Sequence, residues 1–245
     1  QVTYIDSYPG NKTGSISTYM AGKKTGLIWG FETVGIAKTQ EEMDNHIASL
    51  PKGGQDAIGS QWAAGDIMYK DLNGDGKISK GASTWDDHGD LKILGDSNPH
   101  YFYGIDLTAN YKGFDFRCFL QGVLKHDFWP GESSYFWGVR GGYSKWYTIG
   151  LEQHNDYFRD QPIGLAGYEL PVNLDSYYPR PITSKDSDKT SFGAKNQEKQ
   201  SRYMRNAGYM RLKNLQLGYS LPKSVVEKVG ISNCRVFVSG ENLLT

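Results

Sequence analysis

Apolar and polar residues alternate with a period of two from residue 101 onward. The apolar parity holds Tyr101, Tyr103, Ile105, Leu107, Ala109 and Tyr111. The opposite parity holds Phe102, Gly104, Asp106, Thr108 and Asn110. This alternation predicts a β-strand with one apolar face and one polar face.

The dipeptide Lys112-Gly113 is a two-residue turn signal, and the alternation resumes behind it. The apolar face then continues with Phe114, Phe116, Cys118 and Leu120, and the polar face with Asp115, Arg117 and Gln121. We therefore predict a hairpin over residues 101–123 in which Ala109 faces Phe116, Leu107 faces Cys118 and Ile105 faces Leu120.

Each strand of this hairpin is long enough to cross a bilayer, which takes about 9–11 tilted residues. Its tyrosines and phenylalanines gather toward the two ends, where the aromatic girdles of a membrane barrel lie. A soluble β-sandwich shows the same alternation, so periodicity alone leaves both architectures open.

A second strand is predicted within residues 203–221, where leucines and Tyr219 alternate with small or polar residues. Arg211 and Lys213 fall on the parity of the leucines. Either the strand rises above the lipid there, or a bulge near Asn214 shifts its register. After Pro222 the pattern predicts one or two helical turns over 223–229, then a return strand from Arg235.

The remaining segments are predicted to be mostly irregular. Residues 1–100 contain a short β-like run at 27–31, a helix over 41–50 announced by Thr39 and Glu42, and a polar loop over 65–100. Residues 124–201 contain no long strand. Residues 202–245 carry the further strands. The Lys112-Gly113 turn is short and the loop over residues 124–201 is long. Outer-membrane barrels likewise have short periplasmic turns and long extracellular loops.

Composition narrows the classes of function. Among 245 residues, 38% are hydrophobic and the mean hydropathy is −0.57. No run reaches the ~18 apolar residues of a membrane-spanning helix, which excludes a helical membrane protein but not a β-barrel. Lys+Arg and Asp+Glu balance at 27 each, so nucleic acid is not an expected partner. Cys118 and Cys234 form no CxxC motif, and no catalytic motif occurs, so we do not expect an enzyme.

The sharpest local motif is an acidic loop. Oxygen-bearing residues at positions 1, 3 and 5, followed by glycine at 6, match the first half of an EF-hand loop. The candidate ligands are Asp71, Asn73, Asp75, Lys77 (through its carbonyl) and Ser79. Ala82 stands where the bidentate acid belongs, and Asp86, Asp87 or Asp90 are candidates to replace it. Ca²⁺ is the expected ion, and an Asx-rich turn without metal is the alternative.

Aromatic residues of the long loop are candidates for contact with a substrate or partner. They are Trp129, Tyr135, Trp137 and Trp146. They can stack on sugar rings, or they can simply pack the loop together, which is the more common use of such residues.

Several strings, in this order and spacing, resemble the SusC/RagA family of TonB-linked outer-membrane proteins. They are GDI (65–67), DLNGDGK (71–77), DDHGD (86–90), YGI (103–105), YKGFD (111–115), FLQGV (119–123), YMRLKNL (209–215), LGYSLP (217–222) and GENL (240–243). His88 stands where the family favours Pro, and Ala82 where Asp is common; both departures touch only the metal loop.

The resemblance implies an all-β fold: the C-terminal part of a 22-stranded transmembrane antiparallel β-barrel with long extracellular loops. It implies import of oligosaccharides or peptides across the Gram-negative outer membrane. The partners implied are a SusD-like surface lipoprotein, membrane lipid, and the TonB complex acting through a plug that these residues do not include. Because the sequence starts without Met and ends inside a predicted strand, we expect a piece of a longer chain. The alternative from the residues alone is a secreted, calcium-dependent, glycan-binding β-sandwich.

Overall fold

The computed structural model describes residues 2–138, 150–165, 167–181 and 195–244, which divide into two compact units. The sheet unit contains residues 97–127 and 206–244. The core unit contains residues 3–96 and the described residues of 128–205. Each unit is built from residues far apart in the sequence: residues 128–205 separate the two segments of the sheet unit, and residues 97–127 separate the two segments of the core unit.

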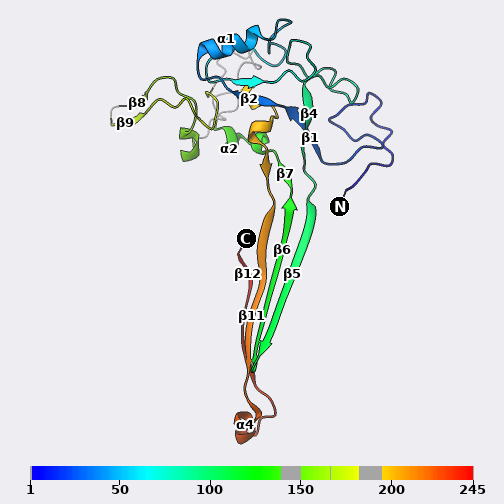
Figure 1. The fold of residues 1–245 in the computed structure, drawn as a ribbon, viewed down its shortest axis with the longest axis vertical. Coiled ribbons are helices and arrows are strands. Elements are labelled where there is room, and N and C mark those ends of the chain that lie inside the picture. Colours follow the sequence, from blue (N-terminus) through cyan, green and yellow to red (C-terminus); the bar gives the residue numbers. More distant parts are fainter. Residues whose placement is uncertain (1, 139–149, 166, 182–194, 245) are drawn as a thin grey trace. The chain divides into compact units, whose positions relative to one another are not determined.

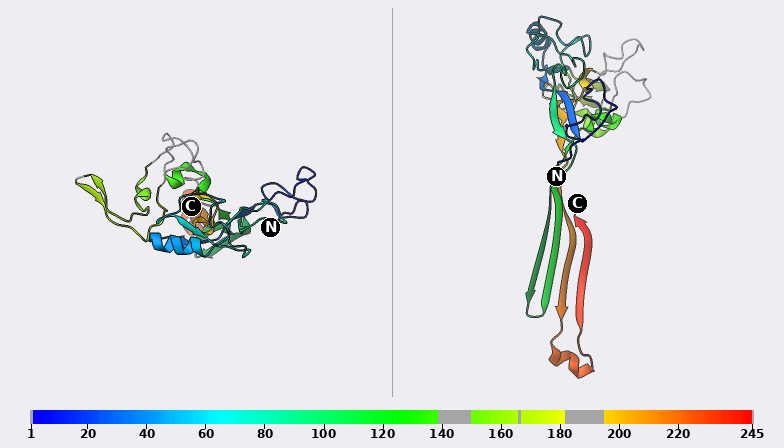
Figure 2. Two further views of the ribbon diagram at one scale, coloured as in Figure 1. Left: turned by 90° about the horizontal axis from the view of Figure 1, so that it is seen from above. Right: turned by 90° about the vertical axis from the view of Figure 1, so that its right-hand side faces the viewer.

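The sheet unit is one antiparallel four-stranded sheet in the order β12-β11-β6-β5, and Figure 1 shows these strands side by side. The strands are β5 (His100–Tyr111), β6 (Phe114–Lys125), β11 (Tyr209–Ser220) and β12 (Arg235–Leu244). A short helix, α4 (Lys223–Val226), and a 3₁₀ turn at Glu227–Val229 join β11 to β12 (Figure 2). Gly230, with φ 71°, ends that turn in the left-handed region that glycine favours.

The predicted hairpin is confirmed in its register. Ala109 pairs with Phe116, Leu107 with Cys118 and Ile105 with Leu120. Lys112 and Gly113 have φ values of 46° and 89°, the two positive values that a tight type I′ turn requires.

A bulge in β11 explains why Arg211 and Lys213 fall on the same sequence parity as the leucines of that strand. The register of β11 shifts between Leu212 and Asn214, against both of its neighbours. The shift leaves Leu212 opposite Leu120 on the apolar face and Arg211 opposite Gln121 on the polar face. Of the two explanations offered by the sequence, the bulge is the one found.

The core unit contains short strands and turns around a main hydrophobic cluster and a smaller one of Ala37, Met43 and Met68. Its elements are β1 (Leu27–Phe31), β2 (Thr33–Ile36), α1 (Gln40–Ala48), β3 (Ile67–Tyr69), β4 (Leu91–Asp96), α2 (Ser134–Trp137), β8 (Ile163–Leu165) and β9 (Tyr168–Leu170). Its 3₁₀ turns are Pro130–Glu132, Glu152–Asn155, Lys195–Gln197 and Ser201–Tyr203. Two-residue strands, β7 (Asp127–Phe128) and β10 (Arg205–Asn206), occur where the chain passes from one unit to the other.

Strand pairs β1-β4, β2-β3 and β8-β9 are antiparallel. The cluster that they and the loops enclose consists of Phe31, Ile36, Leu50, Ile58, Ile67, Tyr69, Ile78, Leu91, Trp129, Trp137, Phe158, Tyr178 and Tyr203. The long segment over 124–201, predicted to lack long strands, does lack them in its described part and contributes four of these side chains.

Helix α1 begins one residue earlier and ends two residues earlier than predicted. Thr39 is its N-cap, and the amide of Glu42 donates to the Thr39 hydroxyl at 3.1 Å. The Glu42 carboxylate accepts from the amide of Lys38 at 2.7 Å, so both members of the predicted box act as caps.

The all-β, antiparallel class is therefore confirmed. No helix in the described ranges is both long enough and apolar enough to cross a membrane.

Candidate functional site

The acidic loop folds on itself through its own backbone amides. The Asp71 carboxylate accepts from the amides of Gly74 at 2.7 Å and Gly76 at 2.9 Å. The side chain of Asn73 accepts from the amide of Asp75 at 2.9 Å. Gly76 adopts φ 79°, which the sharp turn at position 6 of such a loop demands.

Asp90 fills the place left open by Ala82. Ligand atoms of Asp71, Asp75 and Asp90 lie within 4.8 Å of one another, and the Asp90 side chain is fully buried. Its carboxylate accepts from the amides of Leu72 and Ser79, both at 2.8 Å. Of the three acids named as replacements, this geometry selects Asp90.

The charges of this cluster are unequally stabilised. Burial raises the pKa of Asp90, and the nearby Asp71 charge adds to that effect against the N–H donors of the loop. Partial burial also opposes ionisation of Asp71, but the donated N–H groups outweigh it and lower the pKa of Asp71. Two carboxylates this close repel each other, and a hard cation bound between them would relieve that repulsion.

The other three predicted ligands, Asn73, Lys77 and Ser79, lie in the same loop. The Lys77 amide donates to Asp75 at 3.1 Å, and the Ser79 amide donates to Asp90. Asp71, Asp75 and Asp90 are thus the residues that could hold a cation. That one binds there stays a prediction.

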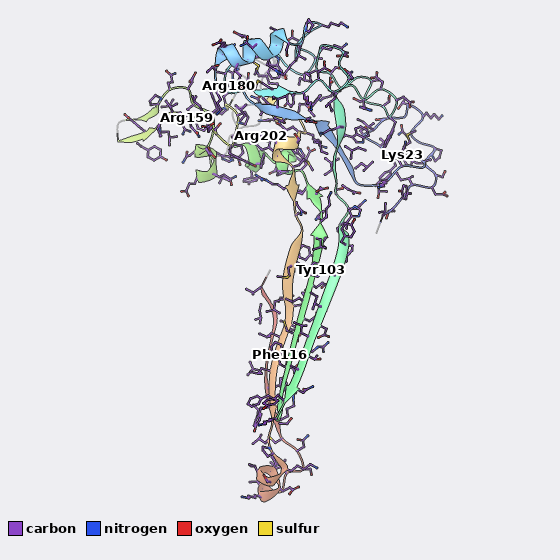
Figure 3. The ribbon with its side chains drawn as sticks, in the orientation of Figure 1. Lys23, Tyr103, Phe116, Arg159, Arg180 and Arg202 are labelled. Carbon is purple, nitrogen blue, oxygen red and sulfur yellow. The ribbon has the colours of Figure 1, made fainter. Side chains whose placement is uncertain are left out.

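A second polar cluster, which the sequence did not reveal, is built on Asp66. This carboxylate is fully buried and accepts from Arg180 at 2.7 and 2.8 Å, and from Lys195 Nζ at 2.6 Å. Asn196 and the amide of Ala63 each donate to it at 2.9 Å. Figure 3 labels Arg180 within the core unit.

The Asp66 cluster joins two distant parts of the core unit. Burial alone would raise the pKa of Asp66, but Arg180 and Lys195 outweigh it and hold that pKa below its usual value. Burial also lowers the pKa of Lys195 against the attraction of Asp66. The partners stand 114 and 129 residues away in sequence, so no local pattern could announce them.

Two of the three described contact aromatics are buried. Trp129 and Trp137 are 6% and 8% exposed and belong to the hydrophobic cluster, where Trp137 lies 5.0 Å from the Tyr203 ring. Of the two alternatives that the sequence offered for them, this burial favours packing of the loop. Tyr135 is 63% exposed and stays a candidate. Trp146 lies outside the described residues.

The sheet unit offers a functional surface of a different kind. Its apolar face is bare within the described residues: Leu107 is 51%, Leu217 54% and Val238 76% exposed. The strand register places these three on one face. Leu107 pairs with Cys118 and Leu217 pairs with Phe116, two residues of the same face of β6, and Val238 pairs with Leu217. No second described sheet covers them, as a soluble sandwich would require.

The opposite face carries ion pairs that cross strands. Arg117 of β6 contacts both oxygens of Asp106 on β5, at 3.1 and 2.7 Å. Arg235 of β12 reaches across β11 to both oxygens of Asp115 on β6. The sheet thus has one uncovered apolar side and one side of mainly charged and amide groups, with Phe119 and Phe237 among them.

Known proteins were compared with the chain. No family model matches it. Over 245 residues the chain is 29% identical to TonB-dependent receptor P3 of Formosa agariphila, covering 99% of the chain. It is 25% identical over 244 residues to TonB-dependent receptor P26 of the same organism. Over almost its whole length, the chain is therefore similar to TonB-dependent receptors. It spans about a fifth of the length of these relatives.

Among solved structures, the RagAB peptide transporter matches the chain with a TM-score of 0.49. That match has 18% identity and covers 98% of the segment and 21% of the solved chain. The RagAB peptide importer in its open-open state gives a TM-score of 0.47 at 18% identity over 97% of the segment and 20% of that chain.

Proposed function

We propose that this receptor segment is part of the wall and extracellular loops of a SusC/RagA-type outer-membrane importer. The observation that carries the proposal is the sheet with one bare apolar face and one ionic face. In water that apolar face is unfavourable, whereas against acyl chains it is favourable. The ionic face then lines the lumen or meets the plug.

The core unit supplies the extracellular part of this arrangement. Its loops carry their own hydrophobic cluster and buried polar contacts, so they keep a defined shape beyond the membrane. We propose that the whole protein lies in the Gram-negative outer membrane and takes up oligosaccharides or peptides with a SusD-like lipoprotein. Uptake is driven by the TonB complex acting on the plug, and no reaction is assigned to this segment.

One observation supports the class of the whole protein: TonB-dependent receptors match the segment over 99% of its residues. RagAB itself is a peptide transporter. The oligosaccharide alternative rests on the family resemblance of the sequence strings given above.

A gene deletion tests the proposal. A strain lacking the full-length receptor should lose growth on one class of oligosaccharide or peptide and keep growth on the matching monomer. The full-length protein should fractionate with the outer membrane and co-purify with a surface lipoprotein. Unimpaired growth on every such substrate would contradict the import function.

A second measurement addresses the sandwich alternative. Residues 1–245 expressed alone should need detergent, because the bare sheet face has no cover of its own. A soluble, monomeric fragment with one cooperative unfolding transition would favour the secreted glycan-binding module instead.

A further inference from the structure

A pocket of about 380 Å³ lies in the N-terminal part of the core unit, lined by residues between 5 and 29 and by Trp85. Backbone hydrogen bonds join the segment over residues 14–16 to the segment over residues 83–85. The amide of Ile16 donates to the carbonyl of Ser83 at 3.0 Å, and the amide of Trp85 donates to Gly14 at 2.9 Å. The volume falls within the range of small-molecule sites, from about 300 to 1,000 Å³. The pocket therefore suits one or a few units of a chain-like ligand and not a folded partner.

Aromatic rings form much of the pocket wall. Trp29 and Trp85 meet edge to face with ring centroids 5.2 Å apart, and Tyr8 and Tyr19 do so at 5.7 Å. Tyr8 and Tyr19 are 41% and 57% exposed, so their rings are accessible to a ligand. The wall also contains a buried donor, the Trp85 indole N–H, which has no acceptor among the residues that the structure describes. Buried donors without partners are uncommon and mark places where a water or ligand oxygen belongs.

The charge of the pocket has one sign. Lys23 and Lys24 are the charged residues among the described lining residues, and no carboxylate stands with them. Lys23 Nζ lies 4.4 Å from the centre of the Trp85 ring (Figure 3 labels Lys23). Within the described ranges neither lysine forms an ion pair. Two ammonium groups without counter-charges favour an anionic ligand.

We propose that this pocket binds an acidic oligosaccharide, a sugar chain carrying carboxylate or sulfate groups. The apolar face of a sugar ring stacks on Tyr19, while Lys23 and Lys24 pair with the anionic substituent. The hydroxyls of Ser17 and Thr18, which also line the pocket, suit the hydroxyl groups of a sugar. An acidic peptide satisfies the lysines but offers no ring to the exposed tyrosines, so the saccharide fits more of the wall.

This inference deepens the proposed import function by naming a substrate class, and it rests on that function. Its test is nevertheless a binding measurement, made on the full-length receptor in detergent without TonB or energy. Failure of import in cells would leave a positive binding result intact, and failure of binding would leave import of other substrates intact.

The probes are trigalacturonate, its neutral methyl ester, a sulfated trisaccharide and a hexaglutamate peptide, titrated by calorimetry at low salt. Trigalacturonate or the sulfated trisaccharide should bind, and whichever binds identifies the anionic group. The methyl ester should bind about ten-fold more weakly than trigalacturonate, the size of effect expected for lost charge-assisted hydrogen bonds. Added salt should weaken binding of the acidic sugar.

Matched variants separate charge from stacking. The double variant Lys23→Gln with Lys24→Gln should weaken binding of the acidic sugar about ten-fold. Lys12→Gln with Lys52→Gln, two exposed lysines outside the pocket, should leave it unchanged. Tyr19→Ala should weaken binding, and Tyr19→Phe, which keeps the ring, should restore it.

Three results would overturn the proposal. They are binding of neither acidic sugar, equal affinity for the methyl ester and trigalacturonate, and preference for hexaglutamate over both sugars. An equal loss of affinity in the Lys12/Lys52 control and in the Lys23/Lys24 variant would likewise show that the acidic sugar does not bind in this pocket.

Discussion

The two units place their apolar side chains in opposite ways. The core unit buries them: Phe31, Ile67 and Tyr69 are fully covered. The sheet unit leaves them open on one face, with Leu107, Leu217 and Val238 more than half exposed. A unit of the first kind can be stabilised by its own contacts, whereas a unit of the second kind needs an apolar environment supplied from outside. Under the proposed function, one chain combines a part that faces water with a part that faces lipid.

Charged groups show the same contrast. In the core unit Asp66 and Lys195 are fully buried and paired. In the sheet unit the Arg117–Asp106 pair is 56% and 41% exposed. Breaking a buried pair leaves an uncompensated charge in a medium of low polarity, whereas exposed groups return to water at little cost. The same type of substitution should therefore reduce stability more in the core unit than in the sheet unit.

Asp66→Asn should produce the largest effect. It removes the negative charge that faces buried Lys195 and its partner Arg180, at a cost of about 3–5 kcal/mol. Amide hydrogen exchange around residues 60–69 and 195–200 of the full-length receptor should accelerate accordingly. The folded state lowers the pKa of Asp66, so its contribution is present above the unfolded value and disappears as pH falls through the folded one. The contribution should therefore begin to fall below about pH 4, and acid should mimic the variant fully only below the lowered folded pKa.

The matched control for that prediction is Asp175→Asn. Asp175 pairs with Lys38 on the surface, where its side chain is 82% exposed. Exchange rates should change little in this variant. Equal effects of the two substitutions would show that the Asp66 cluster is not a buried anchor.

Leu107→Arg should have the next largest effect, because it puts a charge on the face assigned to lipid. At mid-bilayer the cost is ~2–4 kcal/mol. Folding of the full-length receptor into lipid vesicles, titrated with denaturant, measures it. Thr108→Arg is the control, since the neighbouring residue lies at the same depth on the other face. A tolerated arginine at position 107, or a greater loss at 108, would reverse the assignment of the faces.

Whether a contact could be predicted from the sequence depended on how far apart its residues lie along the chain. The hairpin at 101–120 could be predicted to the residue pair because alternation and the Lys112-Gly113 turn are local. The bulge near Asn214 was one of two options, since only the partner strand decides whether Arg211 turns inward. The Asp66 cluster was missed because its charges come from segments more than 100 residues away. The packing of Trp129 was left open for the same reason, because its cover comes from other loops.

The acidic loop gives a smaller and conditional effect. If Ca²⁺ binds between Asp71, Asp75 and Asp90, a free concentration one hundred times Kd should stabilise the folded loop by about 2.7 kcal/mol. Thermal unfolding or exchange of residues 71–90, followed with and without chelator, measures that shift. Asp71→Asn with Asp75→Asn should abolish it, and Asp86→Asn, an exposed acid outside the cluster, should not. No response to Ca²⁺ in the unsubstituted protein would leave an Asx-rich turn that is stabilised by its own amides.

Gly218→Ala should produce the smallest effect, and it tests the ionic face alone. Gly218 lies on β11 between Asp115 of β6 and the outer strand β12, and Arg235 passes over it to reach Asp115. A Cβ at 218 would stand 2.6 Å from an Arg235 nitrogen, inside any normal contact distance. Both obstructing side chains are flexible, so we expect a loss near the low end of overpacking, about 1 kcal/mol.

The double variant Gly218→Ala with Arg235→Gln shows whether that loss comes from the ion pair. If the glycine is there to let Arg235 cross the strand, the alanine should add little once Arg235 is gone. If the two losses add in full in the vesicle-folding titration, the glycine serves the backbone instead. The ionic face would then consist of separate charges, without the continuous band across β6, β11 and β12 that a lumen wall of this kind presents.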